Sequence, residues 1–198
     1  MDSSRLRIIS IDANIGAGKT TVLEFLRDKY SADIDVEPVD KWQPWLERMY
    51  KGGTGVFEFQ LRVWLDRCWP TSAVSSSSMY LERSPFFQLG VFVPANINNG
   101  KMSYEQAILI TEMYDKVMSI WEPEIYVYLR SDPAKCAERI IRRGRTSEDN
   151  IPITYLKELH DLHEQSYDIA VAKGKKVVVI DVEGKTVEEI ATEIAALS

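Results

Sequence analysis

A run of small residues that ends in lysine and threonine lies close to the N-terminus and has the make-up of a phosphate-binding loop. Residues 13–20 read Ala-Asn-Ile-Gly-Ala-Gly-Lys-Thr, which fits Gly-x-x-x-x-Gly-Lys-Ser/Thr with alanine in the first position. Glycines let backbone N–H groups wrap a phosphate, and the helix that follows adds a favourable dipole. We expect Lys19 to reach the β- and γ-phosphates of a nucleotide and Thr20 to hold Mg²⁺. The alternative is a glycine-rich turn that only caps a core helix.

This loop does not by itself identify a reaction. The Asn-Lys-x-Asp pattern that reads guanine in GTPases does not occur in the sequence. Motor-type ATPases carry an acidic residue after four apolar residues, and the nearest such segment, Val177–Asp181, lies at the far end of the chain. Other residues must therefore indicate the chemistry.

Two segments with carboxylates could supply acid–base chemistry beside the loop. Glu37 precedes a proline at the end of a weak strand pattern, and open parallel sheets bind ligands at the carboxyl ends of their strands. We therefore expect Glu37 to face the cleft of the loop, where it could accept a proton from an attacking hydroxyl. Glu82 and Arg83 follow a segment that could be another short strand. The alternative for both segments is an ordinary set of solvated charges at strand ends.

Several arginines surround Gly144 and are followed by the polar residues 146–149. They are Arg139, Arg142, Arg143 and Arg145. Arginines near the end of a helix can simply stabilise its dipole. The alternative is a lid over about residues 139–149, whose guanidinium groups fold over a transferring phosphoryl group.

Composition narrows the classes of partner. The 198 residues carry a net charge of −6, which argues against non-specific binding to nucleic acid or to an anionic membrane. Cys68 and Cys136 are the only cysteines and have no metal-ligand spacing. His160 and His163 are three residues apart, which favours a solvated helix face over a metal site. Because we find neither a signal peptide nor an apolar run near the ~18 residues of a membrane span, we expect a soluble, cytoplasmic protein.

Short apolar runs alternate with longer helical patterns, which is typical of an α/β protein with a parallel sheet. Buried strands are predicted at residues 6–11, 125–129 and 177–180, with a weaker strand at residues 33–37. Residues 52–55 and 75–78 are predicted to be loops, too short to divide the chain. We therefore expect a single domain over residues 1–198.

Helices are predicted where apolar residues recur at steps of three and four, or where capping residues mark a start. The predicted ranges are 107–121, 133–143 with Asp132 as N-cap and a stop at Gly144, 154–172, and 187–197. The apolar stripe from Ala107 to Trp121 could be core or could contact a second copy of the chain. A further helix face carries Gln60, Val63 and Arg67 beside an apolar stripe, as a pocket-lining helix would, although an ordinary amphipathic helix has the same pattern.

Taken together, these motifs resemble the deoxyribonucleoside kinase family, which includes the deoxycytidine, deoxyguanosine, mitochondrial thymidine and insect multisubstrate kinases. The resemblance covers about residues 8–181. It is carried by the loop at residues 14–21, Glu37-Pro38-Val39-Asp40-Lys41-Trp42, Met49-Tyr50-Lys51, Phe59-Gln60, Glu82-Arg83-Ser84, the lid, and residues 155–160. It implies a three-layer α/β/α P-loop kinase fold with a parallel sheet of about five strands.

The resemblance also implies a role for each residue at the reacting centre. Glu37 would be the general base that takes the proton of the 5′-hydroxyl, and Arg83 would hold the 5′-oxygen and Glu37 in line. Lys19 would act on the phosphates, and Glu82 would assist Thr20 at the Mg²⁺. The residues implied to contact the phosphates of ATP are Asn14, Ile15, Gly16, Ala17, Gly18, Lys19, Thr20, Thr21, Arg139, Arg143 and Arg145.

For the nucleoside, the resemblance implies that Tyr50 and Glu148 bind the sugar 3′-hydroxyl. Gln60 would read the edge of the base, Phe92 would stack on it, and Trp42 would close the cleft. The positions next to the base would be Val63, Arg67 and Gln88.

The sequence departs from the family pattern at a few positions. Ala13 replaces the first loop glycine, Ser147 stands where many relatives have a second glutamate, and serines occupy residues 75–78. Relatives that favour thymidine leave room for its 5-methyl group near positions 67 and 88, where this chain has Arg67 and Gln88. An arginine there, usually paired with an aspartate, resembles the kinases of deoxycytidine and deoxypurines, although Gln88 cannot form that ion pair. We therefore expect activity on deoxycytidine and deoxypurines to exceed activity on thymidine.

The sequence thus predicts a deoxynucleoside kinase that uses ATP and Mg²⁺, serves nucleotide salvage for DNA precursor synthesis, and forms a homodimer as its family usually does. One alternative is a nucleoside monophosphate kinase, which would need basic groups for an acceptor phosphate near Tyr50 and Glu148. The other is a non-catalytic nucleotide-binding module, supported only by Ala13 and the serine run.

Overall fold

One parallel sheet forms the centre of the computed structural model, which describes residues 6–52, 54–68, 78–145, 148 and 151–197. Within these residues the strands follow the order β2-β3-β1-β4-β5. They are β1 (Arg7–Ala13), β2 (Asp33–Asp35), β3 (Ser78–Glu82), β4 (Ile125–Arg130) and β5 (Val177–Asp181). Every pairing is parallel, which confirms the predicted parallel sheet of five strands.

Helices surround this sheet. In chain order they are α1 (Lys19–Tyr30), α2 (Val39–Gly52), α3 (Val56–Arg67), α4 (Pro85–Phe87), the π-helix η1 (Gln88–Phe92), α5 (Val93–Asn98), α6 (Tyr104–Met118), α7 (Pro133–Arg143), α8 (Ile153–Ala172) and α9 (Val187–Ala195). Within the described ranges none of these helices is long and apolar enough to cross a membrane.

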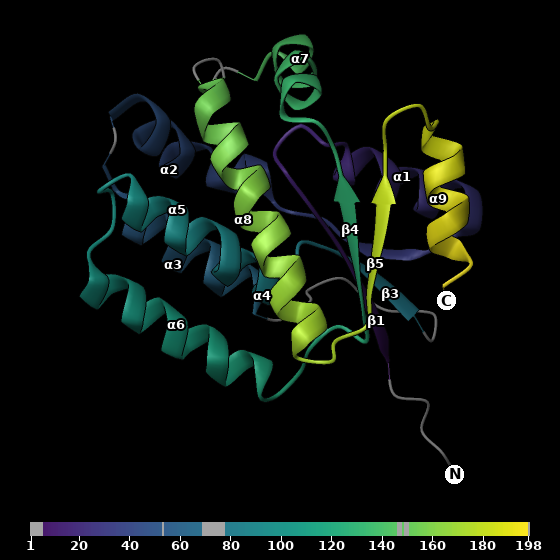
Figure 1. Cartoon of the computed structure of the whole chain (residues 1–198), viewed down its shortest axis with the longest axis horizontal. Coiled ribbons are helices and arrows are strands. Elements are labelled where there is room, and N and C mark those ends of the chain that lie inside the picture. The colour runs from purple at the N-terminus through teal and green to yellow at the C-terminus, as the bar shows by residue number, and fades with distance from the viewer. Residues whose placement is uncertain (1–5, 53, 69–77, 146–147, 149–150, 198) are drawn as a thin grey trace.

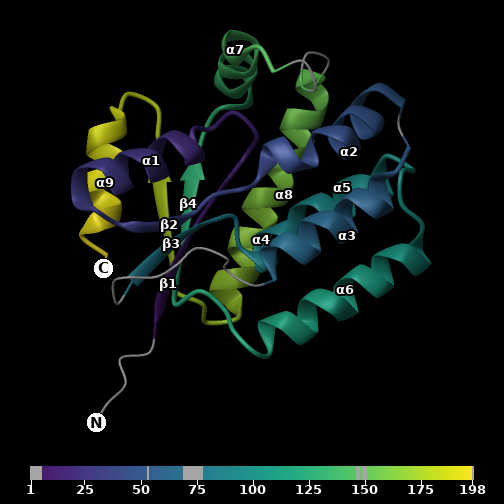
Figure 2. The same cartoon turned by 180° about the vertical axis from the view of Figure 1, so that it is seen from behind.

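The sheet is covered on both faces, and β4 shows how. Ile125, Val127 and Leu129 point to one face and pack in a cluster with α1 and α9. Tyr126 points to the other face and packs with α4, η1, α5 and α8. Figures 1 and 2 show α1 and α9 side by side on one side of the strands and α8 across the other. The predicted three-layer α/β/α arrangement is therefore confirmed.

A third apolar cluster lies beyond the sheet and joins α2, α3, α5 and α6. Ala107, Ile110, Tyr114 and Val117 of the predicted stripe are all buried in the chain, so the stripe is core. The helix ends at Met118, three residues before Trp121, whose indole N–H donates to the carbonyl of Cys68.

Two local predictions were wrong. His163 on α8 is not solvated: its ring is fully buried and stacks on Tyr128 at 5.7 Å between centroids. The reason is that this face of α8 packs directly on the sheet. Ser78 begins β3 instead of ending a loop, while residues 75–77 lie outside the described residues.

The topology places three strand ends beside one another. β1 pairs with β3, and β3 pairs with β2, so residues that follow these strands meet at one edge. Buried Asp12 on β1 accepts hydrogen bonds from the backbone N–H and the hydroxyl of Ser84, at 2.8 and 3.0 Å. The turn after β3 is therefore fixed to the strand that carries the phosphate-binding loop.

Candidate active site

The phosphate-binding loop joins β1 to α1 as predicted. Gly16 and Gly18 have φ angles of +80° and +98°, which favour glycine. A Cβ at Gly16 would lie 2.6 Å from the carbonyl oxygen of Cys136, so the loop also needs glycine there for space. Lys19 is buried at the start of α1, and its Nζ lies 3.4 Å from the carbonyl oxygens of Ala13 and Asn14. Burial, and to a smaller extent the charge of Arg83, lower the pKa of Lys19 to about 8.

Some residues of the loop support it and do not line the cavity. Asn14 donates from Nδ2 to the carbonyl of Leu156 on α8 at 2.8 Å, and its Oδ1 accepts from the Ile15 N–H. Ala17 is buried, and the methyl group of Ala13 packs in the core cluster under α1. Alanine at the first motif position is therefore a strand residue of the core.

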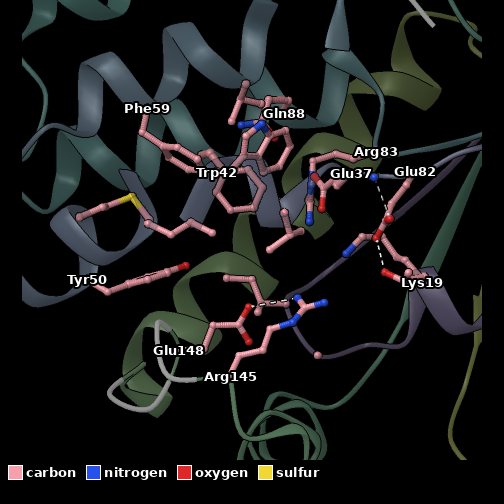
Figure 3. Close-up of a pocket in the computed structure, with 18 of the residues that line it drawn as sticks. Lys19, Glu37, Trp42, Tyr50, Phe59, Glu82, Arg83, Gln88, Arg145 and Glu148 are labelled. Carbon is pink, nitrogen blue, oxygen red and sulfur yellow. Dashed lines mark hydrogen bonds and ion pairs between the residues drawn. The ribbon is translucent and has the colours of Figure 1, made fainter. Parts of the chain in front are cut away.

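A cavity opens at the carboxyl ends of β1, β2 and β3, and most of the predicted site residues line it. These are Ile15, Gly16, Gly18, Lys19, Thr20, Thr21, Glu37, Trp42, Tyr50, Gln60, Val63, Glu82, Arg83, Gln88, Phe92, Arg143, Arg145 and Glu148. Figure 3 shows Glu37, Glu82, Arg83 and Lys19 on one side, and Trp42, Phe59 and Gln88 together at another end.

The two carboxylates of the reacting end are held in different environments. Glu37 Oε1 accepts from Arg83 Nε at 2.8 Å. Glu82 accepts from the Thr20 hydroxyl at 2.8 Å and from the Glu37 backbone N–H at 3.1 Å. Burial acts to raise the pKa of Glu37, but the charges of Arg83 and Lys19 outweigh it and the pKa is lowered. Burial and the charge of Glu37 raise the pKa of Glu82. Of the two side chains, Glu37 therefore has the lower pKa and ionises more readily.

Arg83 is held in a strained conformation. Its φ of +65° lies in the left-handed region, which costs a residue with a Cβ about 1–2 kcal/mol. The guanidinium contacts Glu37, donates to the carbonyl of Ala13 at 3.3 Å, and lies 4.5 Å from the ring centroid of Phe92. These contacts hold the cation of Arg83 between the Glu37 carboxylate and the phosphate-binding loop.

The opposite end of the cavity combines aromatic rings with buried amides. Trp42 and Phe59 meet edge to face at 5.8 Å, and the Trp42 indole N–H donates to Asp66 at 2.7 Å. Gln88 Nε2 donates to Gln60 Oε1 at 3.1 Å. A flat ligand with polar groups on its edge would find stacking surfaces and hydrogen-bonding partners here.

The third side of the cavity is formed by Tyr50 and the lid. Glu148 is buried and accepts from Arg143, and also from Arg145 at 3.5 Å. Burial, with the nearby charge of Glu148, raises the pKa of Tyr50 well above its usual value, so Tyr50 keeps its hydroxyl proton. Figure 3 shows Tyr50, Glu148 and Arg145 on one side of the cavity. Ser147 of the predicted lid lies outside the described residues.

Besides Asn14 and Ala17, two more of the predicted site residues do not line the cavity. Arg139 donates to the Ser131 hydroxyl at 2.8 Å and lies 3.9 Å from the Glu183 carboxylate. Arg67, which was predicted to lie next to the base, does not line this cavity, and its guanidinium is buried against Asp35 at 3.1 Å. Gln88 and Val63, the other two residues predicted next to the base, do line the cavity.

Sequence reasoning missed several residues that also line the cavity, namely Val39, Leu46, Met49, Phe59, Asn96 and Tyr155. Helical spacing could have found some of them, because Leu46 is one turn from both Trp42 and Tyr50, and Asn96 is one turn after Phe92. Met49, Phe59 and Tyr155 lie in segments that carry the family resemblance, without a role assigned to them.

The comparisons with known proteins agree with this geometry. A family model described as "Deoxynucleoside kinase" matches residues 9–197. Thymidine kinase 2, mitochondrial, of Macaca fascicularis is 32% identical over 176 residues, which cover 83% of this chain and 65% of that protein. Deoxycytidine kinase 2 of Gallus gallus is 30% identical over 202 residues, which cover 83% of this chain and 76% of that protein. This chain therefore spans less than two thirds of the length of that thymidine kinase 2.

Among solved structures, deoxyadenosine kinase from M. mycoides has the same fold. Its structure with products dCMP and a flexible dCDP bound has a TM-score of 0.82 at 24% identity, covering 96% of this chain and 100% of that chain. Its structure with bound dCTP has a TM-score of 0.80 at 23% identity, covering 96% of this chain and 99% of that chain.

Proposed function

Because the chain belongs to the deoxynucleoside kinase family, we propose that it transfers the γ-phosphoryl group of ATP to the 5′-hydroxyl of a deoxynucleoside. The observation that carries this proposal is Glu37. It is an ionised carboxylate inside the cavity, between a phosphate-binding loop and an end lined by aromatic rings and amides. An acceptor hydroxyl placed there would have a base beside it and a phosphate donor within reach.

The reaction requires that a proton leave the 5′-hydroxyl and that the negative charge on the phosphates be neutralised. Glu37 takes the 5′-hydroxyl proton as the oxygen attacks the γ-phosphorus, and the bond from that phosphorus to the bridging oxygen of ADP breaks. Arg83, bonded to Glu37 at 2.8 Å, keeps the carboxylate oriented and offers its remaining N–H groups to the attacking oxygen. The ammonium of Lys19 stabilises charge on the phosphates. Positioning and electrostatics supply most of the catalysis in such transfers.

The donor set beside the loop fits Mg²⁺. The Thr20 hydroxyl and the Glu82 carboxylate are hard oxygen ligands that lie 2.8 Å apart. Magnesium sites in such enzymes take one or two protein oxygens and complete their shell with water and substrate phosphates. We propose that Thr20 and Glu82 hold the ion, which when bound neutralises charge on the phosphates.

The remaining cavity residues suit the nucleoside. Tyr50 and Glu148 could donate to and accept from a sugar 3′-hydroxyl, since Tyr50 keeps its proton. Phe92 and Trp42 offer stacking surfaces for a base whose edge meets the amide of Gln60. This arrangement supports a deoxynucleoside acceptor, because Tyr50 and Glu148 offer a hydrogen-bond donor and an acceptor to one sugar hydroxyl.

For the base, we propose that deoxycytidine and deoxypurines are preferred over thymidine. The support comes from Gln88, because Arg67 does not reach the cavity. The buried Gln88 amide occupies the base end beside Gln60, where a 5-methyl group would crowd it.

We also propose that the enzyme acts in nucleotide salvage for DNA precursor synthesis and works as a homodimer. The support for a second copy is on α6, where Tyr104 and Ile108 are exposed beside an apolar groove that includes Pro94.

The test of this function is phosphorylation of the four deoxynucleosides by ATP, with their 5′-monophosphates as parallel acceptors. We expect nucleosides to give monophosphate and ADP. In Glu37→Gln, which keeps the size of the side chain but cannot take the proton, kcat should fall by at least about a hundredfold. Binding of ATP, measured by calorimetry, should change little.

The matched control is Glu24→Gln, the same change on the exposed face of α1, which should leave kcat as in the wild type. An unchanged rate in Glu37→Gln would remove Glu37 from the mechanism. Turnover of monophosphates alone would make the protein a nucleoside monophosphate kinase. ATP binding without turnover of either acceptor would indicate a non-catalytic module.

A further inference from the structure

Arg67, the last residue of α3, is buried where the ends of β2 and β3 meet. Its side chain is 2% exposed and that of Asp35 is 5% exposed. Nη1 donates to Asp35 Oδ1 at 3.1 Å and to the Val36 carbonyl at 3.3 Å. Nη2 donates to the Glu82 carbonyl at 2.8 Å and to the Asp35 carbonyl at 3.4 Å. One guanidinium thus binds the backbone of both strands.

These contacts lie just beyond the last paired residues of the two strands. β2 pairs with β3 in register from Asp33 with Met79 to Asp35 with Leu81. Val36 and Glu82 occupy the next position on each strand, past the end of this pairing. Arg67 donates to the carbonyls of both residues. Its guanidinium therefore joins the two strands at the point where the backbone hydrogen bonds between β2 and β3 end.

The bridged positions immediately precede the residues that react. Glu37 follows Val36, and Arg83 follows Glu82 in the sequence. Glu37 and Arg83 must meet with their side chains 2.8 Å apart, and each is carried by a separate chain segment. A displacement of one segment by about 1 Å can slow a reaction on the order of a hundredfold, because the reacting groups no longer align.

We propose that Arg67 is a positioning residue for phosphoryl transfer, whose buried guanidinium bridges the ends of β2 and β3 and thereby sets the placement of Glu37 against Arg83. This inference rests on the proposed kinase function. The family resemblance implies instead that Arg67 lies next to the base. The positioning role takes the place of that expectation, because Gln60 and Gln88, and not Arg67, line that end of the cavity. A planar fork of N–H donors suits this bridge, since it can serve several acceptors at fixed angles, which an ammonium cannot do.

The test compares Arg67→Met, which keeps the aliphatic stem, with Arg130→Met. Arg130 also joins two elements, through an ion pair at 2.8 Å with Glu164 on α8, but it does not line the cavity. In Arg67→Met we expect kcat to fall at least about tenfold for deoxycytidine, deoxyadenosine and thymidine alike, with each nucleoside KM changed less than about threefold. In Arg130→Met kcat should stay within about twofold of the wild type, measured below the melting temperature of both variants.

Arg67→Lys tests the bridge if Arg67→Met does not fold. Because lysine keeps the charge without the fork, we expect a loss of kcat that is again the same for every base. Full activity in Arg67→Lys would overturn the bridging role. A base-dependent change in the ratio of kcat/KM values would instead assign Arg67 to the base and would also overturn the proposal. Wild-type protein without turnover would overturn the kinase function itself, so the two failures are distinguishable.

Discussion

The polar part of the base end consists of two glutamine side chains whose orientations depend on each other. Gln88 Nε2 donates to Gln60 Oε1 at 3.1 Å, and both side chains are buried. An amide whose oxygen is engaged in this way has its NH₂ group directed to the opposite side, so its donors and acceptors are presented in a fixed order. In the proposed site, Gln88 would therefore act on the base in two ways, by occupying space and by orienting Gln60.

Gln88→Ala should relax the selection against thymidine. Loss of the amide makes room for a 5-methyl group, and one added methyl contact or clash in a pocket changes selectivity by about tenfold or more. We expect the ratio of kcat/KM for thymidine over that for deoxycytidine to rise by about tenfold. The same change at Gln165, on the exposed face of α8, should leave the ratio unchanged. A ratio that is unchanged in Gln88→Ala would show that this side chain does not limit the choice of base.

At the scale of elements, the end of α7 supplies the cations of the lid. Gly144 ends the helix with a φ of +66°, and the chain then turns so that Arg145 can reach Glu148. Arg143 also donates to Glu148, so the carboxylate balances two guanidinium groups at the mouth of the cavity. Bound phosphates would compete with Glu148 for these arginines, because charged hydrogen bonds to phosphate are strong.

Substitutions of single arginines by alanine should distinguish the arginines that contact the phosphates from those that do not. In Arg145→Ala we expect kcat/KM for ATP to fall about tenfold or more, the value of one charge-assisted hydrogen bond. Arg142→Ala removes the same charge from the same helix, but that side chain is exposed and does not line the cavity. Its kcat/KM should stay within about twofold of the wild type. Equal losses in both variants would mean that only the net charge of the lid matters.

Elements whose limits depend on local chemistry were predicted closely. The limits of α7 follow from Asp132, which accepts from two N–H groups of the first turn, and from Gly144 after the last turn. β2 is shorter than predicted, because its pairing with β3 stops at Asp35. The carbonyl of the next residue, Val36, accepts a hydrogen bond from Arg67. The π-helix η1 had no sequence signal, since an extra residue per turn changes neither the composition nor the spacing noticeably.

For the whole molecule, residues that follow strands were the easiest part of the site to predict. Glu37 and Arg83 lie at strand ends, and parallel sheets bring such ends to one edge. Arg67 was misplaced because its direction depends on Asp35, which lies far away in the sequence, and helical spacing does not tell which neighbour a long side chain selects. His163 was misplaced for the same reason, since the polar ring packs against the sheet.

That buried histidine couples the stability of the whole fold to pH. The His163 ring lies against both Phe87 and Tyr128, with centroids at 6.0 and 5.7 Å, and its Nδ1 lies 2.6 Å from the carbonyl of Leu159. Burial, with the charge of Arg83, lowers its pKa from 6.5 to about 3. Above pH 6.5 the ring is neutral in the folded and unfolded chain. Below that value the unfolded chain binds a proton that the folded chain refuses, so the free energy of unfolding falls as the pH falls towards 3.

His163→Phe should remove this dependence, because phenylalanine keeps a ring in the stack and does not titrate. Between pH 7 and pH 5 the wild type should lose about 2 kcal/mol more of its unfolding free energy than the variant, at about 1.4 kcal/mol per pH unit below 6.5. Urea unfolding of both proteins at the two pH values measures this difference, and the other titrating groups cancel because both chains share them. Equal losses in the two proteins would mean that the folded chain takes up a proton on His163 as readily as the unfolded chain does.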